Sequence, residues 1–425
     1  MKIKKLKSIT MMLGISALGI ILITPTSCSK DKIRGCTDPT SLNYNSAAEE
    51  NDGSCIYPTP TPTPPPGPGT SSTELLSKSV TVPPTMDGVI DASWANCQKL
   101  VGTAVIPNIS DFILFSGTSF NFSIRSMRDA TNIYFLVEYD DPTDSKDRES
   151  WYFDTATNLW KQQNKIATSV TDKFYEDKFA FLWPTATANA SWNSATCYST
   201  CHAVPSGVGY NTSTKHYAEA GESVDMWHWK RVRTQPNNQL DDQRIIAIVD
   251  VNNPSATEMK NGGRGGDAKT AGAYNNNKQT LTITGTSTSV TVPKYISLTP
   301  NYIYTPADIS NGTAKLVTAV DANGVLTYAG GTIDPATGGY EMNTGSKRFP
   351  SIYTDGPFVG SRGDISTYAN YNGTGWVVEV SRTLTTSDIT NDVQFNVTQE
   401  YMFGFAIFEN LAIAHAIKPN LKLKF

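Results

Sequence analysis

The amino-acid sequence predicts an all-β protein whose main domain is an antiparallel β-sandwich, and three observations support this prediction. First, apolar residues alternate with polar ones in segments such as "FNFSIR", where Phe120, Phe122 and Ile124 share one face. Second, apolar runs such as "NIYFLVEY", "KFAFLW", "GWVVEVSR" and "YMFGFAIF" have the length of buried strands. Third, turn-forming clusters separate these runs. Many short strands between turns are typical of a sandwich.

Composition limits the classes of function that the chain can have. The 425 residues, 39% of them hydrophobic and 17% charged, suffice for one large domain or two ordinary ones. The formal net charge is −4, and no long basic run occurs after the N-terminal segment. The sequence therefore gives no electrostatic reason to expect binding to nucleic acid or to an anionic membrane surface.

The N-terminal segment, residues 1–27, is predicted to be a lipoprotein signal peptide. Four lysines within "MKIKKLK" precede the apolar run "MMLGISALGIILI", which has signal-peptide length but is short for a membrane span. The following "TPTSCSKDK" resembles the loose lipobox of Bacteroidetes-type lipoproteins and places Cys28 at the lipidated position, although Pro25 and Thr26 depart from the stricter Leu-Ala-Gly pattern. Cleavage nearby, leaving a soluble periplasmic protein, is the alternative.

This N-terminus predicts a lipid-anchored protein of the bacterial cell envelope, on the periplasmic or the surface face of the outer membrane. No later stretch is apolar for long enough to cross a bilayer. Any attachment to the membrane is therefore expected to be the lipid alone.

Residues 28–57 are predicted to carry the anchor and a small module stapled by a Cys36–Cys55 disulfide. Two cysteines enclosing a short polar loop in an oxidising compartment favour this pairing. Closing a loop of about 20 residues contributes roughly 3 kcal/mol. The segment resembles the GCTDPxAxNYNPxAxxDDGSC repeat of secreted Bacteroidetes proteins. Four side chains offer oxygens to Ca²⁺ or serve only as turn residues: Asp38, Asn43, Asn45 and Asp52.

A Pro-rich linker at residues 58–72 precedes the main domain, which is expected to span residues 73–425. The repeated Pro-Thr of this linker favours an extended spacer that holds the domain away from the membrane. Within the domain, residues from 252 to about 292 are rich in Gly, Asn, Thr and Ser. We interpret them as a long excursion from the sandwich rather than a separate domain.

The most informative motif is "ATCYSTCHAV", in which Cys197 and Cys201 directly precede His202. In the haem c signature CxxCH, two thiols add to the haem vinyl groups and the adjacent histidine coordinates the iron. Here one extra residue intervenes, as in the rarer CxxxCH variant. The alternatives are a disulfide between these cysteines, or pairing of Cys97 with one of them. A structural Zn²⁺ site is less favoured, because no second CxxC or HxxxH pair accompanies the motif.

Several motifs in order resemble a known family. "MDGVIDASWANC" resembles the opening of family 9 carbohydrate-binding modules. "CYSTCH" and then "SVDMWHWKRVR", "GSRGDI", "GWVVEVSRTLTT", "NDVQF" and "YMFGFAIFENLAIAHA" resemble the haem-binding domain family of the ethylbenzene dehydrogenase gamma subunit. The resemblance covers residues 81–425, apart from the Gly- and Asn-rich insertion. It implies a haem-binding sandwich of the type seen in family 9 carbohydrate-binding modules and DOMON domains.

The resemblance also implies one haem, of c-type with b-type as the alternative. Cys197 and Cys201 would hold it covalently and His202 would be the proximal iron ligand. His415, in the apolar segment "LAIAHAI", is the first choice for the second axial ligand, because haem b relatives take one ligand from this late region. A core histidine satisfied by backbone groups is the alternative reading of His415. The substitutes for it are His216 and Met226.

Candidate walls of the haem pocket lie in "DMWHWKRVR". If this segment is a strand, one face carries Met226, His228 and Lys230 and the other carries two tryptophans. The candidate pocket residues are Trp227, His228, Trp229, Lys230 and Arg233. The tryptophans would equally suit a sandwich core or a sugar-stacking platform, and the basic residues either pair with haem propionates or form a solvated strand end.

A haem with two protein ligands has no open coordination position, so it carries electrons and does not bind substrate. In the molybdenum dehydrogenases that the family serves, the haem subunit relays electrons. The chain has no GxSxG or HExxH motif, and the pairs Asp140–Asp141 and Asp241–Asp242 are interpreted as solvated turns. We therefore expect an electron-transfer protein that is not an enzyme, with a redox partner at the envelope. The alternative is a carbohydrate-binding surface lipoprotein without haem.

Overall fold

The structure is a computed structural model that describes residues 32–57, 68–166, 168–200, 217–250, 253 and 255–425. The chain divides into two compact units, Met1–Pro65 and Pro66–Phe425. In the first unit, strands β1 (Arg34–Gly35) and β2 (Glu50–Asn51) pair in parallel. The predicted disulfide between Cys36 and Cys55 is present in this module.

Each of the four candidate calcium ligands of the small module accepts a hydrogen bond from a backbone N–H group. Asp38, Asn45 and Asp52 each accept a hydrogen bond from the backbone N–H two residues further on, at 2.9, 3.0 and 2.9 Å. The side chain of Asn43 accepts one from the N–H of Ile56 at 2.7 Å. These are the contacts of turn-forming side chains, so the structure gives the calcium reading no support.

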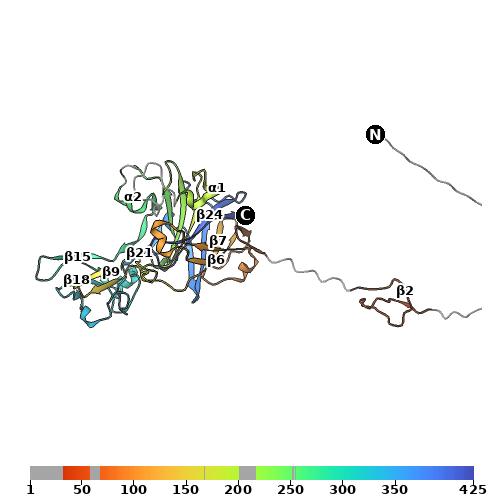
Figure 1. The fold of residues 1–425 in the computed structure, drawn as a ribbon, viewed down its shortest axis with the longest axis horizontal. Helices are drawn as coiled ribbons and strands as arrows, with labels where there is room; N and C mark the ends of the chain where they lie inside the picture. The colour runs from red at the N-terminus through yellow and green to blue at the C-terminus, as the bar shows by residue number, and fades with distance from the viewer. Residues whose placement is uncertain (1–31, 58–67, 167, 201–216, 251–252, 254) are drawn as a thin grey trace, which may run out of the picture. The chain divides into compact units, whose positions relative to one another are not determined.

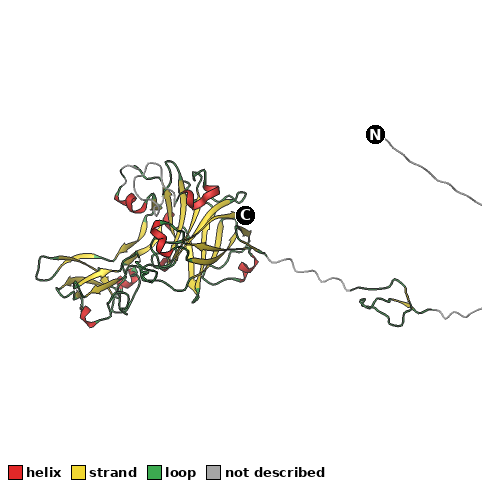
Figure 2. Ribbon diagram, viewed as in Figure 1, coloured by secondary structure: helices red, strands yellow, loops and turns green. Residues whose placement is uncertain are grey.

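The second unit is built on one sheet of thirteen strands, which confirms the all-β prediction (Figure 2). Its strands are β3 (Thr70–Ser71), β4 (Glu74–Ser79), β5 (Lys99–Val105), β6 (Ser119–Arg128), β7 (Asn132–Asp140), β10 (Lys178–Pro184), β11 (Ser223–Lys230), β12 (Asp241–Ile246), β13 (Arg264–Gly266), β22 (Ser366–Tyr371), β23 (Gly375–Thr383), β24 (Tyr401–Phe408) and β25 (Ala416–Lys424). The order is β13-β12-β11-β10-β24-β25-β4-β6-β7-β23-β22, with β5 beside β25 and β6 and with β3 on β5. Most pairs are antiparallel, whereas β3 and β4 pair in parallel with their neighbours.

The two halves of this sheet face each other and enclose the main core. Aromatic rings from β6, β7 and β23 meet rings from β10, β11 and β24. Examples are Phe122 with Phe405 at 4.8 Å between ring centroids, Phe135 with Phe181 at 5.6 Å, and Trp229 with Trp376 at 4.9 Å. Aromatic pairs at such spacings add about 0.5–1.5 kcal/mol each to the free energy gained by burial. The core between the layers therefore fixes which strand faces point inward and which point outward.

A second core lies in a lobe that extends from the sandwich, at the left of Figure 1. Its strands are β8 (Trp151–Asp154), β9 (Leu159–Gln162), β14 (Ala271–Asn276), β15 (Gln279–Thr282), β16 (Ser289–Val292), β17 (Tyr295–Ile296), β18 (Lys315–Val320), β19 (Leu326–Tyr328), β20 (Gly331–Ile333) and β21 (Ile352–Val359). The excursion expected to end near residue 292 continues to β21, which pairs with β14. It extends further because Trp151, Trp160 and Phe349 bury their rings against its later strands.

Helical segments are short and lie at the edges of the strand layers (Figure 2). The α-helices are α1 (Trp192–Ala195), α2 (Ala256–Asn261) and α3 (Pro306–Ser310). The 3₁₀ turns are η1 (Ala92–Asn96), η2 (Ser110–Phe115), η3 (Thr196–Ser199), η4 (Gln235–Asn237), η5 (Pro335–Thr337) and η6 (Ser361–Gly363). In the part of the chain that the structure describes, no helix has the length and apolar character needed to cross a membrane.

Candidate functional site

An apolar pocket lies on the outer face of the layer formed by β10, β11, β24 and β25. In β10, Phe179 and Phe181 point into the main core, so the residues between them point outward. The pocket has about 370 Å³ of empty space, its open mouth included. Its lining residues are Ala180, Leu182, Cys197, Met226, Gly404, Phe405, Ala406, Phe408, His415 and Ile417.

The floor of the pocket is made of small residues on adjacent strands. Ala180 on β10 lies opposite Ala406 on β24, and Leu182 lies opposite Gly404. A Cβ atom built on Gly404 would approach Sγ of Cys197 to 3.2 Å, which is tighter than most van der Waals contacts. Glycine at this position therefore allows the segment that carries Cys197 to lie directly on the sheet.

The segment between β10 and β11 brings Cys197 to this face. Nε1 of Trp192 in α1 donates to the carbonyl oxygen of Met402 at 2.8 Å, and Oγ1 of Thr196 donates to Oδ1 of Asn420 at 3.2 Å. These bonds hold α1 and η3 against the outer face, where Cys197 is a buried free thiol. Burial raises the pKa of this thiol to about 11, so it remains protonated at neutral pH.

His415, in the loop between β24 and β25, is the pocket residue best suited to bind a metal ion. Nδ1 of His415 lies 2.7 Å from the carbonyl oxygen of Ile413, so Nδ1 carries the proton and donates it. In that tautomer the lone pair is on Nε2, which is the arrangement typical of metal-binding histidines. The ring packs on Phe408 at 4.4 Å and on Phe112 at 5.0 Å, which limits its rotation.

Met226 on β11 completes the set of sequence-predicted residues at the pocket. It lies opposite Leu182 in the β10–β11 register and is buried. Three side chains chosen from the sequence, Cys197, Met226 and His415, therefore line one cavity. Four further predicted residues lie outside the described residues: Cys28, Cys201, His202 and His216.

The predicted alternation along β11 is present, but it places the two tryptophans away from the pocket. Trp227 packs in the main core against Trp183 at 5.5 Å, and Trp229 stacks on Phe179 at 5.6 Å. Both indoles are fully buried. They fill the space between the layers, where large aromatic side chains bury most area. The structure thus corrects their assignment as pocket walls.

His228 faces outward beside the pocket but does not line it. Its ring stacks against Phe408, which lines the pocket, at 5.5 Å, and Nδ1 lies 3.4 Å from Oε1 of Gln243. Burial, together with the positive charges of Lys230 and Lys178, holds its pKa well below the usual value, so the ring is neutral. His228 is therefore a neighbour of the site through Phe408.

Lys230 and Arg233 form ion pairs with buried carboxylates. Lys230 pairs with Asp241, and Arg233 pairs with Glu176. Both carboxylates are fully buried, and Lys230 is itself 1% exposed. The structure therefore gives no support to a role of these cations with haem propionates, and it also overturns the alternative of a solvated strand end. Asp241 also pairs with Arg362, and Glu176 lies 3.6 Å from Arg148, so each of the two pairs is part of a larger network of charges.

Cys97 belongs to a different part of the core. It is a free, buried thiol that packs with Trp94, Met127 and Leu136. Since Cys97 and Cys197 are both free thiols, the alternative in which they form a disulfide with each other is wrong.

Sequence reasoning missed a group of buried carboxylates. The pair Asp241–Asp242 was expected in a solvated turn, yet both residues are 0% exposed in β12, and Asp141 is also 0% exposed. Asp242 lies close to Asp225 and Asp392. The sequence signal was an aspartate at a position of "SVDMWHWK" that shares its strand face with the two tryptophans, followed along the chain by a strand that begins with two aspartates.

The fold and the pocket together define an all-β sandwich with an apolar site that presents a thiol, a thioether and an imidazole. A family model described as ethylbenzene dehydrogenase matches residues 116–418. This match covers well over half of the chain, and the protein belongs to that family.

Solved structures of a family 9 carbohydrate-binding module from Caldicellulosiruptor kristjanssonii are also similar to this chain. The module in complex with glucose is 11% identical, with a TM-score of 0.26, and the match covers 83% of this chain and 94% of the module. The module in complex with cellotriose gives the same identity and TM-score, with 83% and 92% covered. No curated protein matches the sequence.

Proposed function

We propose that this protein binds one haem in the pocket of Cys197, Met226 and His415 and transfers single electrons at the cell envelope. The observation that carries the proposal is the meeting of these three side chains. They come from three separate segments, and each is a residue type that holds haem. Membership of the ethylbenzene dehydrogenase family supports the proposal.

The described residues suit a haem in their chemistry. Cys197 would hold the haem covalently, because its thiol could add across a vinyl group to give a thioether. His415 offers Nε2 as an axial ligand, held in place by the hydrogen bond of Nδ1 to Ile413. When bound between two protein ligands, haem supplies a one-electron iron couple. The apolar walls exclude water and keep the local dielectric low, which tunes the potential of such a couple.

The proposal also covers the location and partner of the protein. A lipid on Cys28 would tether the chain to the outer membrane, and the Pro-rich linker would separate the sandwich from the bilayer. The partner would be a redox protein of the envelope that donates or accepts the electron. We do not propose any substrate chemistry for this chain.

A carbohydrate-binding function without haem is less well supported by this structure. Binding modules that hold sugars by stacking need aromatic faces at the surface. All eight tryptophans of the chain are buried: Trp94, Trp151, Trp160, Trp183, Trp192, Trp227, Trp229 and Trp376. The tryptophan platform on which that function was based is therefore not available.

The test is a haem stain of the full chain after denaturing electrophoresis, with the protein made in a host that matures c-type cytochromes. We expect a stained band and a c-type pyridine haemochrome spectrum for the native sequence. The Cys197→Ala, Cys201→Ala double variant should lose the stain, and Cys97→Ala, which changes a thiol in a separate cluster, should keep it.

Two other outcomes would contradict parts of the proposal. A native protein that is coloured but loses its haem on denaturation would be of b-type, and covalent attachment through Cys197 would be wrong. A colourless protein that is retained on a polysaccharide column would favour the carbohydrate-binding function instead.

A further inference from the structure

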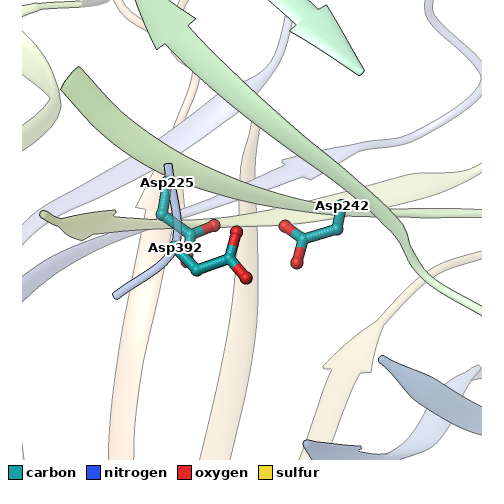
Figure 3. A group of neighbouring side chains, drawn as sticks. All are labelled: Asp225, Asp242 and Asp392. Atoms are coloured by element: carbon teal, nitrogen blue, oxygen red, sulfur yellow. The ribbon is translucent and has the colours of Figure 1, made fainter. Parts of the chain in front are cut away.

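Three buried carboxyl groups converge at one edge of the sandwich, on a different face from the pocket. Asp225 comes from β11, Asp242 from β12 and Asp392 from the loop between β23 and β24. One oxygen from each lies within 4.8 Å of the others. Figure 3 shows the carboxylates of Asp392 and Asp242 pointing toward each other, with Asp225 beside Asp392.

The strand register explains why Asp225 and Asp242 meet. Asp242 lies directly opposite Trp227, and Asp225 shares a strand face with Trp227 because it is two residues away. Since Trp227 points into the main core, both aspartates also point to the inner face, at the β11–β12 edge. They are 0% exposed, and Asp392 is 1% exposed.

One oxygen of Asp225 is tightly held, which fixes the direction of the other. Oδ2 accepts hydrogen bonds from Nε1 of Trp227 at 3.0 Å, from the N–H of Val393 at 2.8 Å and from Nη1 of Arg382 at 3.2 Å. Oδ1 of the same carboxyl has no hydrogen-bond partner among the residues that the structure describes. This side chain is therefore anchored with one unsatisfied oxygen.

The other two carboxyls are also unsatisfied. Oδ2 of Asp392 accepts from Oγ1 of Thr386 at 2.6 Å, whereas its Oδ1 has no partner among the described residues. In the same part of the chain neither oxygen of Asp242 has a hydrogen-bond donor, and a fourth carboxyl, Asp364, also interacts with it. A buried polar group without a partner costs about 1–3 kcal/mol, and a charged one costs more. Orphaned oxygens aimed at one point indicate that a positive group belongs there.

Within the described part of the chain, little positive charge faces this cluster. The guanidinium of Arg382 is the cation that faces it, and Arg244 is paired with a further carboxyl, Asp267. Asp388, a partly buried residue of the same loop, adds to the negative potential at Asp392. Burial first, and then repulsion from Asp392 and Asp267, raise the pKa of Asp225 to about 8, and similar causes raise that of Asp242 well above its usual value.

We propose that Asp225, Asp242 and Asp392 bind a Ca²⁺ ion. Calcium takes carboxylate oxygens at about 2.3–2.6 Å, so two oxygens on one ion are separated by at most about 4.6–5.2 Å. The observed limit of 4.8 Å agrees with this range. Three carboxylates from three chain segments supply up to six oxygens without an octahedral arrangement, which suits Ca²⁺ better than Mg²⁺ with its strict octahedral geometry.

The bound ion would join the loop after β23 to the β11–β12 edge. Between Thr385 and Asn391 this loop is exposed or partly exposed. The site is independent of the haem proposal, because none of its ligands lines the pocket. Ion binding to the folded state alone stabilises that state by mass action.

The experiment is thermal unfolding of the full chain, stripped with EDTA and titrated with Ca²⁺, combined with Tb³⁺ luminescence excited through tryptophan. Tb³⁺ is a probe for Ca²⁺ sites, and the indole of Trp227 contacts Asp225 directly. We expect Ca²⁺ to raise the unfolding midpoint of the native chain and to quench the Tb³⁺ signal by competition. Mg²⁺ at the same concentration should produce a much smaller shift.

The variant Asp242→Asn tests whether the cluster binds a metal ion or instead holds protons on its carboxyl groups. It should abolish both the Ca²⁺-dependent shift and the Tb³⁺ signal, while Asp140→Asn, which changes an exposed aspartate on β7, should leave both unchanged. If the native chain does not respond to Ca²⁺ and Asp242→Asn is simply more stable at pH 8, the carboxyls hold protons and the proposal is overturned. An equal response to Mg²⁺ would overturn the assignment to calcium.

Discussion

Replacing His415 with alanine in the haem-loaded protein should change its absorption spectrum from six-coordinate low spin to high spin. The hydrogen bond from Nδ1 to Ile413 holds the tautomer whose lone pair is on Nε2, and His415 lines the pocket together with Cys197. Removing this imidazole would open one axial position of the iron. Visible absorption and electron paramagnetic resonance of the oxidised protein measure the change.

Met226→Leu is the matched control for this prediction. Leucine keeps nearly the same volume and apolar character as methionine but has no sulfur that binds iron. Met226 is buried in the same pocket, so the substitution tests whether any change at the site alters the spectrum. We expect a low-spin spectrum for Met226→Leu. The reverse pattern, with His415→Ala unchanged and Met226→Leu high spin, would assign the axial position to the methionine.

At or above pH 8, where Asp225 is ionised, replacing Arg382 with methionine should lower the free energy of unfolding by about 3–5 kcal/mol, the usual cost of removing one partner from a buried ion pair. Arg382 and Asp225 are both 0% exposed in their side chains and are joined at 3.2 Å. The guanidinium also donates to the carbonyl oxygen of Val393 and lies over the Trp227 ring at 4.9 Å. Urea unfolding in the presence of EDTA measures the loss without a contribution from bound cations.

Lys424→Met is the control, because its ion pair with Glu74 is 32% and 42% exposed. Exposed pairs contribute about 0–1 kcal/mol. A similar loss of stability in both variants would mean that the effect of Arg382→Met is not due to the buried pair.

The loss caused by Arg382→Met should also depend on pH. Burial raises the pKa of Asp225 to about 8, so the folded chain takes up a proton that the unfolded chain releases above about pH 4. The contribution of Asp225 to the free energy of unfolding is therefore greatest below about pH 4 and is lost as the pH rises toward 8. Without the guanidinium the folded pKa rises further, so the variant should be less impaired at pH 5 than at pH 8. A larger deficit at pH 5 would show that Arg382 acts mainly through packing.

Strands could be located from the sequence because their signal is local. The segments "KFAFLW" and "YMFGFAIF" became β10 and β24, and β11 has the alternation expected of "DMWHWK". The local sequence did not show which face of a strand packs against the core. Trp227 and Trp229 were assigned to a pocket, but the packing of the second layer against β11 placed them in the core.

Part of the candidate site could be predicted, because thiol, imidazole and thioether are uncommon side chains with definite chemistry. Cys197 and His415 were chosen from a motif and a family resemblance, and the pairing of β10 with β24 brings their segments together. Their distance in space could not be predicted, since 218 positions separate residues 197 and 415 along the chain. The carboxyl cluster was missed for the same reason, as the loop with Asp392 reaches Asp225 only in the folded chain.

By itself, the sequence determined the strand pattern, the disulfide of the small module and the kinds of side chain available to hold a cofactor. These depend on residue type and on spacing over a few positions. The tertiary structure alone decided which side chains share an environment: the burial of all eight tryptophans, the pairing of Lys230 with Asp241, and the meeting of Asp225 with Asp242 and Asp392. Burial and electrostatic interaction depend on distance through space, and that distance is set only when the layers of the sandwich close on each other.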